Sequence, residues 1–424
     1  MNDIEAPQQQ THPEPTSGQR LPMLAFYIGS AISFVGDMFT MLAIPWFVLQ
    51  TTGSVTQTGI TAFFATLPSV FSAFFGSALV DRLGYRRTSV YGDIASGLTV
   101  LLIPLLYHTG GLAFWQLLAL VFLGGLLKSP GATARHSMVP ELAVLAGLRL
   151  ERANAFSDGI NRVSGLIAAP LAGVLIVIIG TSNLLWLDAA SFLISALLIG
   201  CLVPDVAVAM PDDAATGEQR YLQRLWEGVR FILHDGLICS LVVVILITNL
   251  IDGAFFSVVE PAYIKHVFNS AIPFGLIVAA SGGAAFVGTL IFSVIGHRMP
   301  RRLTYGIGYT IGGALSFWVF LLWPILPVLI GWQIIAGLAI SAVNPIIGTV
   351  MQERLPVAMR ARVFGTMSAG TLAGIPLGTF ISGFVVAWIG LSSTLLIMGA
   401  LYLLTTLSLL VNPAMRQMDR PDPA

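Results

Sequence analysis

The chain has 424 residues, of which 56% are hydrophobic and only 10% are charged, with 21 acidic and 21 basic residues. Soluble globular domains carry about 25% charged residues, so this composition and a mean hydropathy of +0.85 indicate a membrane protein. The zero formal net charge excludes a strongly basic nucleic-acid-binding surface.

The first residues, 1–21, are polar and rich in Pro and Gln, which predicts a disordered cytoplasmic tail without a cleaved signal peptide. Twelve apolar runs follow, each close to the roughly 20 residues that a transmembrane helix needs. All are predicted to be helices, because hydrocarbon leaves backbone polar groups no partner outside the segment. The predicted spans are 22–49, 57–80, 89–107, 112–130, 154–180, 183–203, 237–260, 273–296, 303–324, 326–350, 363–389 and 391–411.

The basic residues predict the orientation of these spans, since Lys and Arg collect on the cytoplasmic side. With the N-terminus inside, 18 of the 21 basic residues fall in cytoplasmic loops or tails. The exceptions are Lys265, in an outer loop, and Lys128 and Arg162, within or near spans. We therefore expect a multi-pass protein of a bacterial cytoplasmic (inner) membrane with both termini in the cytoplasm.

The spans divide into two similar halves. Asp37 and Asp252 lie 215 residues apart, the pair Arg86-Arg87 recurs 215 residues later, and Gly173 and Gly180 recur after 210 residues. Such repeats are typical of transporters. The predicted units are an N-terminal six-helix bundle (22–203), a cytoplasmic linker (204–236), a C-terminal six-helix bundle (237–412) and a cytoplasmic tail (413–424).

The linker contains an amphipathic segment, RYLQRLWEGVRFIL, at residues 220–233. Its apolar residues follow the i, i+3, i+4 spacing of a helix face. It is predicted to be a helix at the membrane interface, either as a plain connector or with a regulatory role.

Ionisable residues inside the spans are functional candidates, because a charge in hydrocarbon costs about 2.5–3.5 kcal/mol or more. Asp37 and Asp252 are each the sixteenth residue of their predicted span. Burial disfavours a charged carboxylate, so each can take up and release a proton; the alternative is a fixed hydrogen bond to a neighbouring helix. Asn249, one turn before Asp252, could orient a ligand or bond to a helix.

The remaining charged residues in or near the spans have other predicted roles or positions. Asp158 and Arg162, at i and i+4 in span 154–180, are expected to form an ion pair along one helix face, with a structural or gating role favoured over substrate contact. Glu260 is expected near the outer surface in contact with water, and Asp93 and Asp188 near span ends.

The loop after the second span reads SALVDRLGYRR, and in this context it resembles the cytoplasmic loop motif of the major facilitator superfamily. Ser77 stands where that motif has its first glycine. The matching residues are Leu79, Asp81, Arg82, Gly84, Arg86 and Arg87. The resemblance covers nearly the whole chain, and it is closest to the branch of macrolide-efflux and enterobactin-exporter proteins.

The resemblance implies a twelve-helix fold in which Asp81 and the arginines form a charge relay that closes the cytoplasmic side. It also implies that spans 22–49 and 237–260 face each other across a central cavity, with Asp37 and Asp252 placed for substrate-coupled protonation. Span 154–180 partly resembles the antiporter motif at Gly165, Pro170 and Gly173, although Ala169 and Val174 depart from it. Small residues there allow close helix contact.

One part of the family pattern is missing. No Lys or Arg occurs between Arg87 and Lys128, where the family often carries a proton-linked arginine. Lys128 could substitute, but it is expected to lie close to the cytoplasmic turn.

The predicted function is export of amphipathic or hydrophobic small molecules in exchange for protons, by a monomer that needs no cofactor beyond the proton gradient and binds neither metal nor nucleic acid. The alternative is a dedicated exporter of an endogenous metabolite such as a siderophore. The partial antiporter motif favours export over import, and a channel fits the repeat and the paired acids less well. An enzyme is not expected, because GxSxG, HExxH and P-loop motifs are absent from the sequence.

Overall fold

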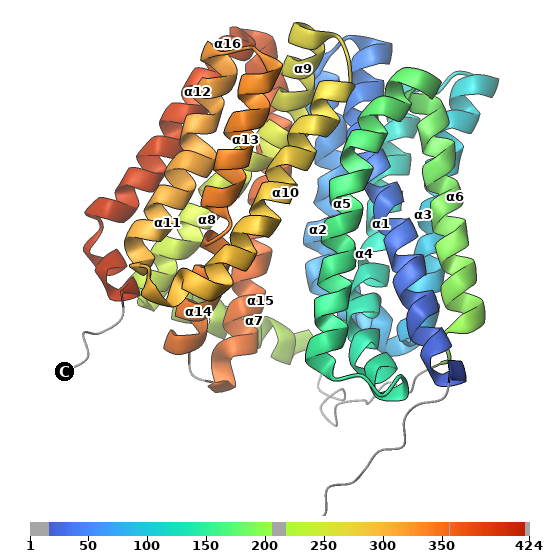
Figure 1. Cartoon of the computed structure of the whole chain (residues 1–424), viewed down its shortest axis with the longest axis horizontal. Coiled ribbons are helices and arrows are strands. Elements are labelled where there is room, and N and C mark those ends of the chain that lie inside the picture. Colours follow the sequence, from blue (N-terminus) through green and yellow to red (C-terminus); the bar gives the residue numbers. More distant parts are fainter. Residues whose placement is uncertain (1–16, 206–217, 356, 420–424) are drawn as a thin grey trace, which may run out of the picture.

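The structure is a computed structural model that describes residues 17–205, 218–355 and 357–419. The side chains of some helical residues, including 73–79, 81 and 218–225, lie outside the described part. Within that part the chain is helical and contains no strand. Two helix bundles stand side by side, the first at the right of Figure 1 and the second at its left. The predicted all-helical, multi-pass fold is confirmed.

The first bundle, which we call the N half, contains six long helices. Five of them contain internal prolines, among them Pro45, Pro68, Pro104, Pro130 and Pro170, which membrane helices tolerate because neighbouring helices satisfy the freed backbone groups. The six helices are α1 (Ser17–Thr52), α2 (Val55–Leu83), α3 (Tyr85–Thr109), α4 (Phe114–Leu145), α5 (Leu150–Ile179) and α6 (Thr181–Leu202).

The second bundle, the C half, follows the linker helix α7 (Glu218–His234). Its spans are interrupted more often than those of the N half, including by two π-helical turns, η1 (Phe255–Val259) and η3 (Thr310–Ala314). Its helices are α8 (Gly236–Ala254), α9 (Glu260–Phe268), α10 (Ile272–Ile295), α11 (Arg301–Tyr309), α12 (Leu315–Leu322), α13 (Leu326–Ile340), α14 (Val343–Arg354), α15 (Val357–Leu372) and α16 (Gly374–Val411). A short 3₁₀ turn, η2 (Gly296–Arg298), precedes α11, and another, η4 (Pro413–Met418), follows α16.

All twelve predicted spans have a helical counterpart. Ten helical segments among the described residues are long and apolar enough to cross a membrane. One of them, Arg362–Leu409, contains two predicted spans that meet at Gly390, and α2 accounts for the remaining one.

Several helices continue beyond the predicted spans. The largest difference is α4, which ends at Leu145 instead of residue 130. Hydropathy marks only the apolar part of a helix, whereas helical hydrogen bonding continues into the polar segment. Lys128 is therefore placed in the middle of α4, and Arg135 lies in the helix instead of the predicted loop.

The backbone reproduces the half-length repeat at two glycines. Gly180, between α5 and α6, has φ 85° and ψ 158°, and Gly390, within α16, has φ 83° and ψ 166°. This left-handed region is accessible to glycine at little cost and disfavoured for other residues. Each half therefore makes the same tight turn between its fifth and sixth spans.

The two halves meet through glycine faces. A Cβ atom on Gly59 of α2 would lie 2.8 Å from the Cα atom of Gly383 in α16, and a Cβ on Gly173 of α5 would lie 2.7 Å from the carbonyl oxygen of Ala271, just before α10. Gly275 of α10 is likewise in contact with the Ala169 carbonyl. The expected close helix contact at Gly173 is thus found, and its partner belongs to the other half.

Hydrogen bonds join the halves at the end opposite α7, which we call the far end (top of Figure 1). Thr56 Oγ1 donates to the carbonyl of Gly383 at 3.2 Å. Lys265 Nζ in α9 donates to the carbonyl of Leu49, in the last turn of α1. A cation at a helix C-terminus is favourable, so this contact helps to hold the two halves together at the far end.

At the α7 end, Asp235 connects the linker to the C half. Its Oδ1 atom accepts hydrogen bonds from the backbone N–H groups of Leu237 and Ile238, at 3.0 and 3.1 Å, and so caps α8. Its Oδ2 atom lies 2.6 Å from Nε of Arg354. Burial by itself would raise the pKa of the Asp235 carboxyl, but the hydrogen bonds from Arg354 and the backbone outweigh it and hold the pKa below its usual value.

We expect Asp235→Ala to lower the free energy of unfolding at pH 7 by about 1–2 kcal/mol, because it removes a helix cap and an ion pair. Since the lowered pKa belongs to the folded state, the contribution is present above about pH 4 and is lost as pH falls through the folded-state value. Thermal unfolding of the detergent-solubilised protein at neutral and acidic pH measures this. Glu151→Gln, at an 80% exposed carboxylate, is the control, and a pH-independent Asp235→Ala effect would contradict the prediction.

Candidate functional site

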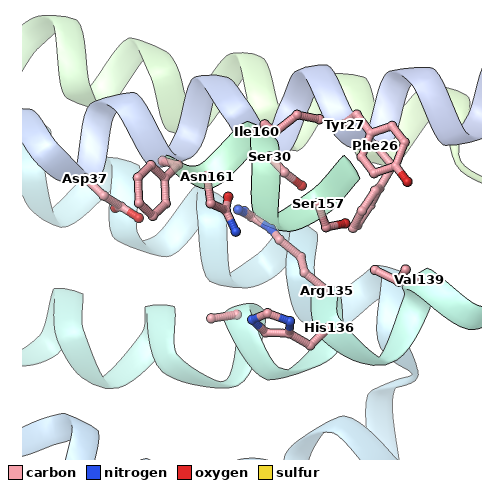
Figure 2. Close-up of a pocket in the computed structure, with 12 residues that line it drawn as sticks. Phe26, Tyr27, Ser30, Asp37, Arg135, His136, Val139, Ser157, Ile160 and Asn161 are labelled. Atoms are coloured by element: carbon pink, nitrogen blue, oxygen red, sulfur yellow. The ribbon is translucent and has the colours of Figure 1, made fainter. Parts of the chain in front are cut away.

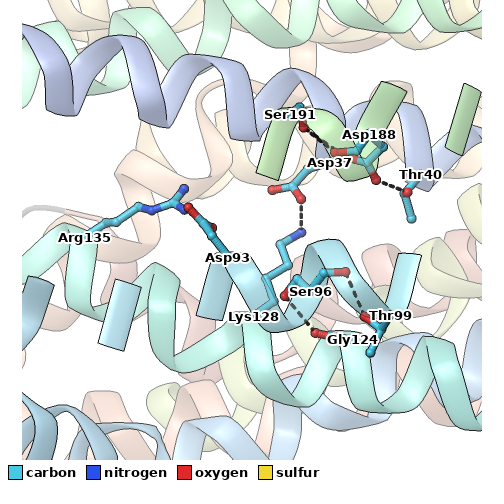
Figure 3. A network of polar contacts seen from close by, with 10 residues as sticks. All are labelled: Asp37, Thr40, Asp93, Ser96, Thr99, Gly124, Lys128, Arg135, Asp188 and Ser191. Carbon is cyan, nitrogen blue, oxygen red and sulfur yellow. Dashed lines mark hydrogen bonds and ion pairs between the residues drawn. The ribbon is translucent and has the colours of Figure 1, made fainter. Parts of the chain in front are cut away.

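The strongest polar cluster lies inside the N half, where α1, α4 and α6 meet. Asp37 of α1 forms an ion pair with Lys128 of α4, at 2.6 Å between Oδ1 and Nζ. Figure 3 shows Asp188 of α6 directly beside Asp37. Two carboxyl groups therefore lie close to a single ammonium group.

Asp188 is fully buried. It accepts hydrogen bonds from Thr40 Oγ1 of α1 and from Ser191 Oγ, the latter at 3.3 Å. Gly36 makes the approach of α6 possible, since a Cβ there would collide with Asp188 Oδ1 and Ser191 Oγ. The expectation that Asp188 lies near a span end is wrong: α6 is packed so that this residue faces the middle of α1.

A second ion pair lies one layer nearer the α7 end. Arg135 of α4 pairs with Asp93 of α3, and both side chains are largely buried. Ser195 of α6 donates to Asp93 Oδ2 at 2.7 Å, and Arg135 Nε donates to Ser89 Oγ at 3.0 Å. Asp93 was expected near a span end and Arg135 in a loop; instead the pair joins three helices, because α4 continues past the apolar run.

Two cavities adjoin the Asp37–Lys128 pair. The larger, of about 250 Å³, lies between α1, α4 and α5. Figure 2 shows its lining, in which Arg135 and Asn161 point toward one another and Asp37 stands at one end. Its polar side chains are Asp37, Arg135, His136, Ser30, Ser157 and Asn161, and its aromatic ones are Phe26, Tyr27 and Phe34.

The smaller cavity, of about 130 Å³, is lined by Asp37, Lys128 and Asp188 together with apolar residues of α1, α3, α4 and α6. Asp37 lines both cavities. The Asp37 side chain therefore stands between the two cavities, while Lys128 lines only the smaller one.

Asp252 has a different environment. Its Oδ2 atom accepts a hydrogen bond from Tyr402 Oη of α16 at 3.2 Å, inside the C half. Tyr402 packs against Tyr309 and Phe317. In the structure each of the two acids is turned into its own bundle, where Asp37 pairs with Lys128 and Asp252 bonds to Tyr402; their placement for substrate-coupled protonation stays a prediction.

Asn249 takes the helix-bonding role that the sequence left as an alternative. Its Nδ2 atom donates to the carbonyl of Thr371 in α15 at 3.1 Å. It joins two spans of the C half and lines neither cavity described above.

The predicted ion pair between Asp158 and Arg162 does not form. Both residues are exposed, and Arg162 places its guanidinium 5.6 Å from the ring centre of Phe286 in α10. Helical spacing allows the ion pair, but the Arg162 side chain extends to the C half instead. Its position over the Phe286 ring is stabilising, because a cation is attracted to the face of an aromatic ring.

Only part of the loop motif can be described. Arg82 is exposed, Gly84 has a φ of 82°, and Arg86 Nη1 donates to the carbonyl of Val203 at 3.2 Å. Arg87 lies 3.6 Å from Asp205. These contacts join the start of α3 to the end of α6 within the N half; the side chains of Leu79 and Asp81 lie outside the described residues.

Glu260 contradicts its predicted exposure to water. It begins α9 and is completely buried, and neither carboxylate oxygen has a hydrogen-bond partner. The residue follows the π-helical turn η1, which sets the direction of its side chain.

The sequence held a signal for the missed polar cluster. Asp188, Ser191 and Ser195 are spaced i, i+3 and i+7 in an otherwise apolar segment, so they form a polar stripe on one helix face. Such a stripe in a membrane helix indicates burial against a partner with matching polar groups.

We expect Lys128→Gln to lower the free energy of unfolding by about 1–3 kcal/mol, because it leaves two partly or fully buried carboxyl groups without their cation. Adding Asp37→Asn to the same chain should recover most of the loss, since it removes the uncompensated charge. Thermal unfolding of the two single variants, the double variant and the wild type measures the coupling. Additive losses would show that the two side chains do not depend on each other.

Comparison with known proteins gives consistent matches over the whole chain. The family model described as Major Facilitator Superfamily matches residues 26–259 and 241–423. The multidrug efflux pump Tap of Mycolicibacterium fortuitum is 30% identical over 408 residues, which cover 95% of this chain and 98% of that protein. Macrolide efflux protein A of Streptococcus pyogenes is 21% identical over 90% of this chain and 93% of its own length.

Solved structures share the fold at lower identity. The nucleoside transporter NupG superposes with a TM-score of 0.71 at 14% identity, over 92% of this chain and 98% of that one. A bacterial homolog of the human lysosomal transporter Spinster superposes with a TM-score of 0.73 at 15% identity, over 96% of this chain and all of that one.

Proposed function

This chain belongs to the Major Facilitator Superfamily, a family of transporters and not of enzymes, and we propose that it is a proton-coupled antiporter that exports amphipathic or hydrophobic small molecules. The names of two relatives, a multidrug efflux pump and a macrolide efflux protein, support export of drug-like compounds. The α7 end is then the cytoplasmic end, in a cytoplasmic (inner) membrane, and the far end is the outer end.

The larger cavity supports this class of substrate. It combines the rings of Phe26, Tyr27 and Phe34 with a carboxylate, a guanidinium and neutral polar groups. Ligand sites that are mainly apolar with a few convergent polar groups suit amphipathic molecules. Its residues come from the half of α1, α4 and α5 nearer the α7 end, so a substrate would enter it from the cytoplasm.

The observation that carries proton coupling is the arrangement of Asp37, Lys128 and Asp188. With all three ionised, this group of partly or fully buried side chains carries one net negative charge, and an uncompensated charge inside the membrane is costly. One proton, or one cationic group of a substrate, neutralises it. Exchange of the first for the second is the coupling that an antiporter requires.

In the proposed cycle, a substrate reaches Asp37 from the larger cavity and displaces the proton from the pair of carboxyl groups. The halves then rock, the outer end opens, and the substrate leaves while a proton returns from outside. The glycine contacts between α2 and α16 and between α5 and α10 support such rocking, because at those positions backbone meets backbone without interlocking side chains.

We expect Asp37→Asn to abolish proton-driven efflux while the protein stays folded, since the amide cannot exchange a proton. The measurement is dye efflux from proteoliposomes with and without an imposed pH gradient, at matched protein content. Glu151→Gln, which changes an exposed acid of the same half, should transport like the wild type. Gradient-driven efflux by Asp37→Asn at the wild-type rate would exclude its role.

We expect Asp81→Ala to slow turnover more than it weakens equilibrium substrate binding, if the loop motif closes the cytoplasmic side. The two quantities are the efflux rate in proteoliposomes and the dissociation constant from tryptophan fluorescence quenching by the same dye. An unchanged turnover would contradict this role, and the arginines of this loop would then serve only to set the orientation of the spans in the membrane.

A further inference from the structure

Glu260 is the most unusual ionisable group in the C half. It is fully buried and both of its side-chain oxygens lack a hydrogen-bond partner. Asp252, two turns earlier in the same span, differs because it accepts a hydrogen bond from Tyr402. A carboxyl group is normally buried only with partners, since an isolated ionised carboxylate in an apolar interior costs several kcal/mol.

The surroundings of Glu260 offer no counter-charge. The segment α9 packs against η1, α1 and α10 and contacts α12 through Tyr263, and η1, α10 and α12 contain no ionisable residue. In α1 the ionisable groups are Arg20, in the first turn, Tyr27, which donates to the carbonyl of Ala153, and Asp37, which is paired with Lys128.

The other ionisable groups of α9 are also turned elsewhere. Tyr263 Oη donates to the carbonyl of Phe320, Lys265 donates to that of Leu49, and His266 is exposed. Glu260 is therefore compatible with this packing only as the neutral acid.

The backbone provides a means of moving this residue. The N–H group of Glu260 bonds to the carbonyl of Phe255, five residues earlier, in the π-helical turn η1. A π turn holds one more residue than an α turn and is frequent at functional sites. Converting it to α-helical pairing would rotate the helix beyond it by about 100°.

The same rotation acts on the far end. Lys265, five residues after Glu260, makes the hydrogen bond that joins α9 to the last turn of α1. Rotation of α9 therefore breaks the contact between the halves and turns Glu260 out of its apolar site in one movement.

We propose that Glu260 is a proton-binding site that controls closure of the outer end, taking a proton from the outer water before α9 closes. The carboxylate binds the proton while the outer end is open, closure buries the neutral acid, and reopening returns the proton to the same side. This step transfers no net charge across the membrane, and it rests on the proposed alternating access.

Infrared spectroscopy tests the protonation itself, independently of transport. The wild-type spectrum at neutral pH should contain the carbonyl band of a protonated carboxylic acid without hydrogen bonds, and Glu260→Gln should lose it. Glu227→Gln, which removes an exposed carboxylate paired with Arg362, should retain it. A wild-type spectrum identical to that of Glu260→Gln in this region overturns the proposal.

Spin labels test the movement. Cysteines introduced at Thr109 and Pro324, exposed at the far end of the two halves, report their separation once the native Cys201 and Cys239 are replaced by serine. In the wild type the population with the longer distance should grow as pH rises. Glu260→Gln should keep the shorter distance at every pH, and Glu227→Gln should behave like the wild type.

The outcomes separate this inference from the proposed function. The role of Glu260 is disproved if Glu260→Gln opens with pH in the same way as the wild type. It is also disproved if the wild type shows no pH-dependent opening while it still exports dye along a proton gradient. Neither result contradicts the proposed antiport. If the wild type exports no substrate under any gradient, the proposed function fails, whereas the infrared result on Glu260 still stands by itself.

Discussion

The requirement that a charge inside the membrane have a partner governs the arrangement of this protein. The N half meets it with ion pairs: Asp37 with Lys128, and Asp93 with Arg135. Because these pairs join α1, α3 and α4, and Ser195 and Asp188 attach α6 to them, the packing of the bundle and its chemistry depend on the same side chains. A bundle built in this way cannot change the charge of one member without affecting how its helices pack.

The C half has the same span arrangement but a different interior. Where the N half places a second acid on its sixth span, the C half has Tyr402 beside Asp252, within a group of aromatic rings. A phenol donates one hydrogen bond without adding a charge, so the C half has no ion pair at the corresponding position. The two repeats have similar backbone arrangements, including the turns at Gly180 and Gly390, but they differ in their ionisable groups.

The sequence predicted the framework well because its signals are local. Apolar runs located the spans, and constant offsets located the two halves. The partners of charged side chains were harder to predict, because hydropathy does not show where a helix ends: α4 continues to Leu145, and this places Arg135 beside Asp93. Distance along a span also does not give the direction of a side chain, so the burial of Glu260, set by a π-helical turn, and the reach of Arg162 to Phe286 were not foreseen.

The glycine faces between the halves have a thermodynamic consequence. Contacts such as Gly59 with Gly383 are made by backbone atoms, so they offer little interaction energy that distinguishes one relative orientation of the bundles from another. The groups that can distinguish orientations are then the side chains that cross between the halves, such as Lys265 and Thr56 at the far end and Arg162 over Phe286. If the bundles rock as proposed, a preference that depends on so few side chains leaves only a small difference in free energy between orientations, which a single protonation can reverse.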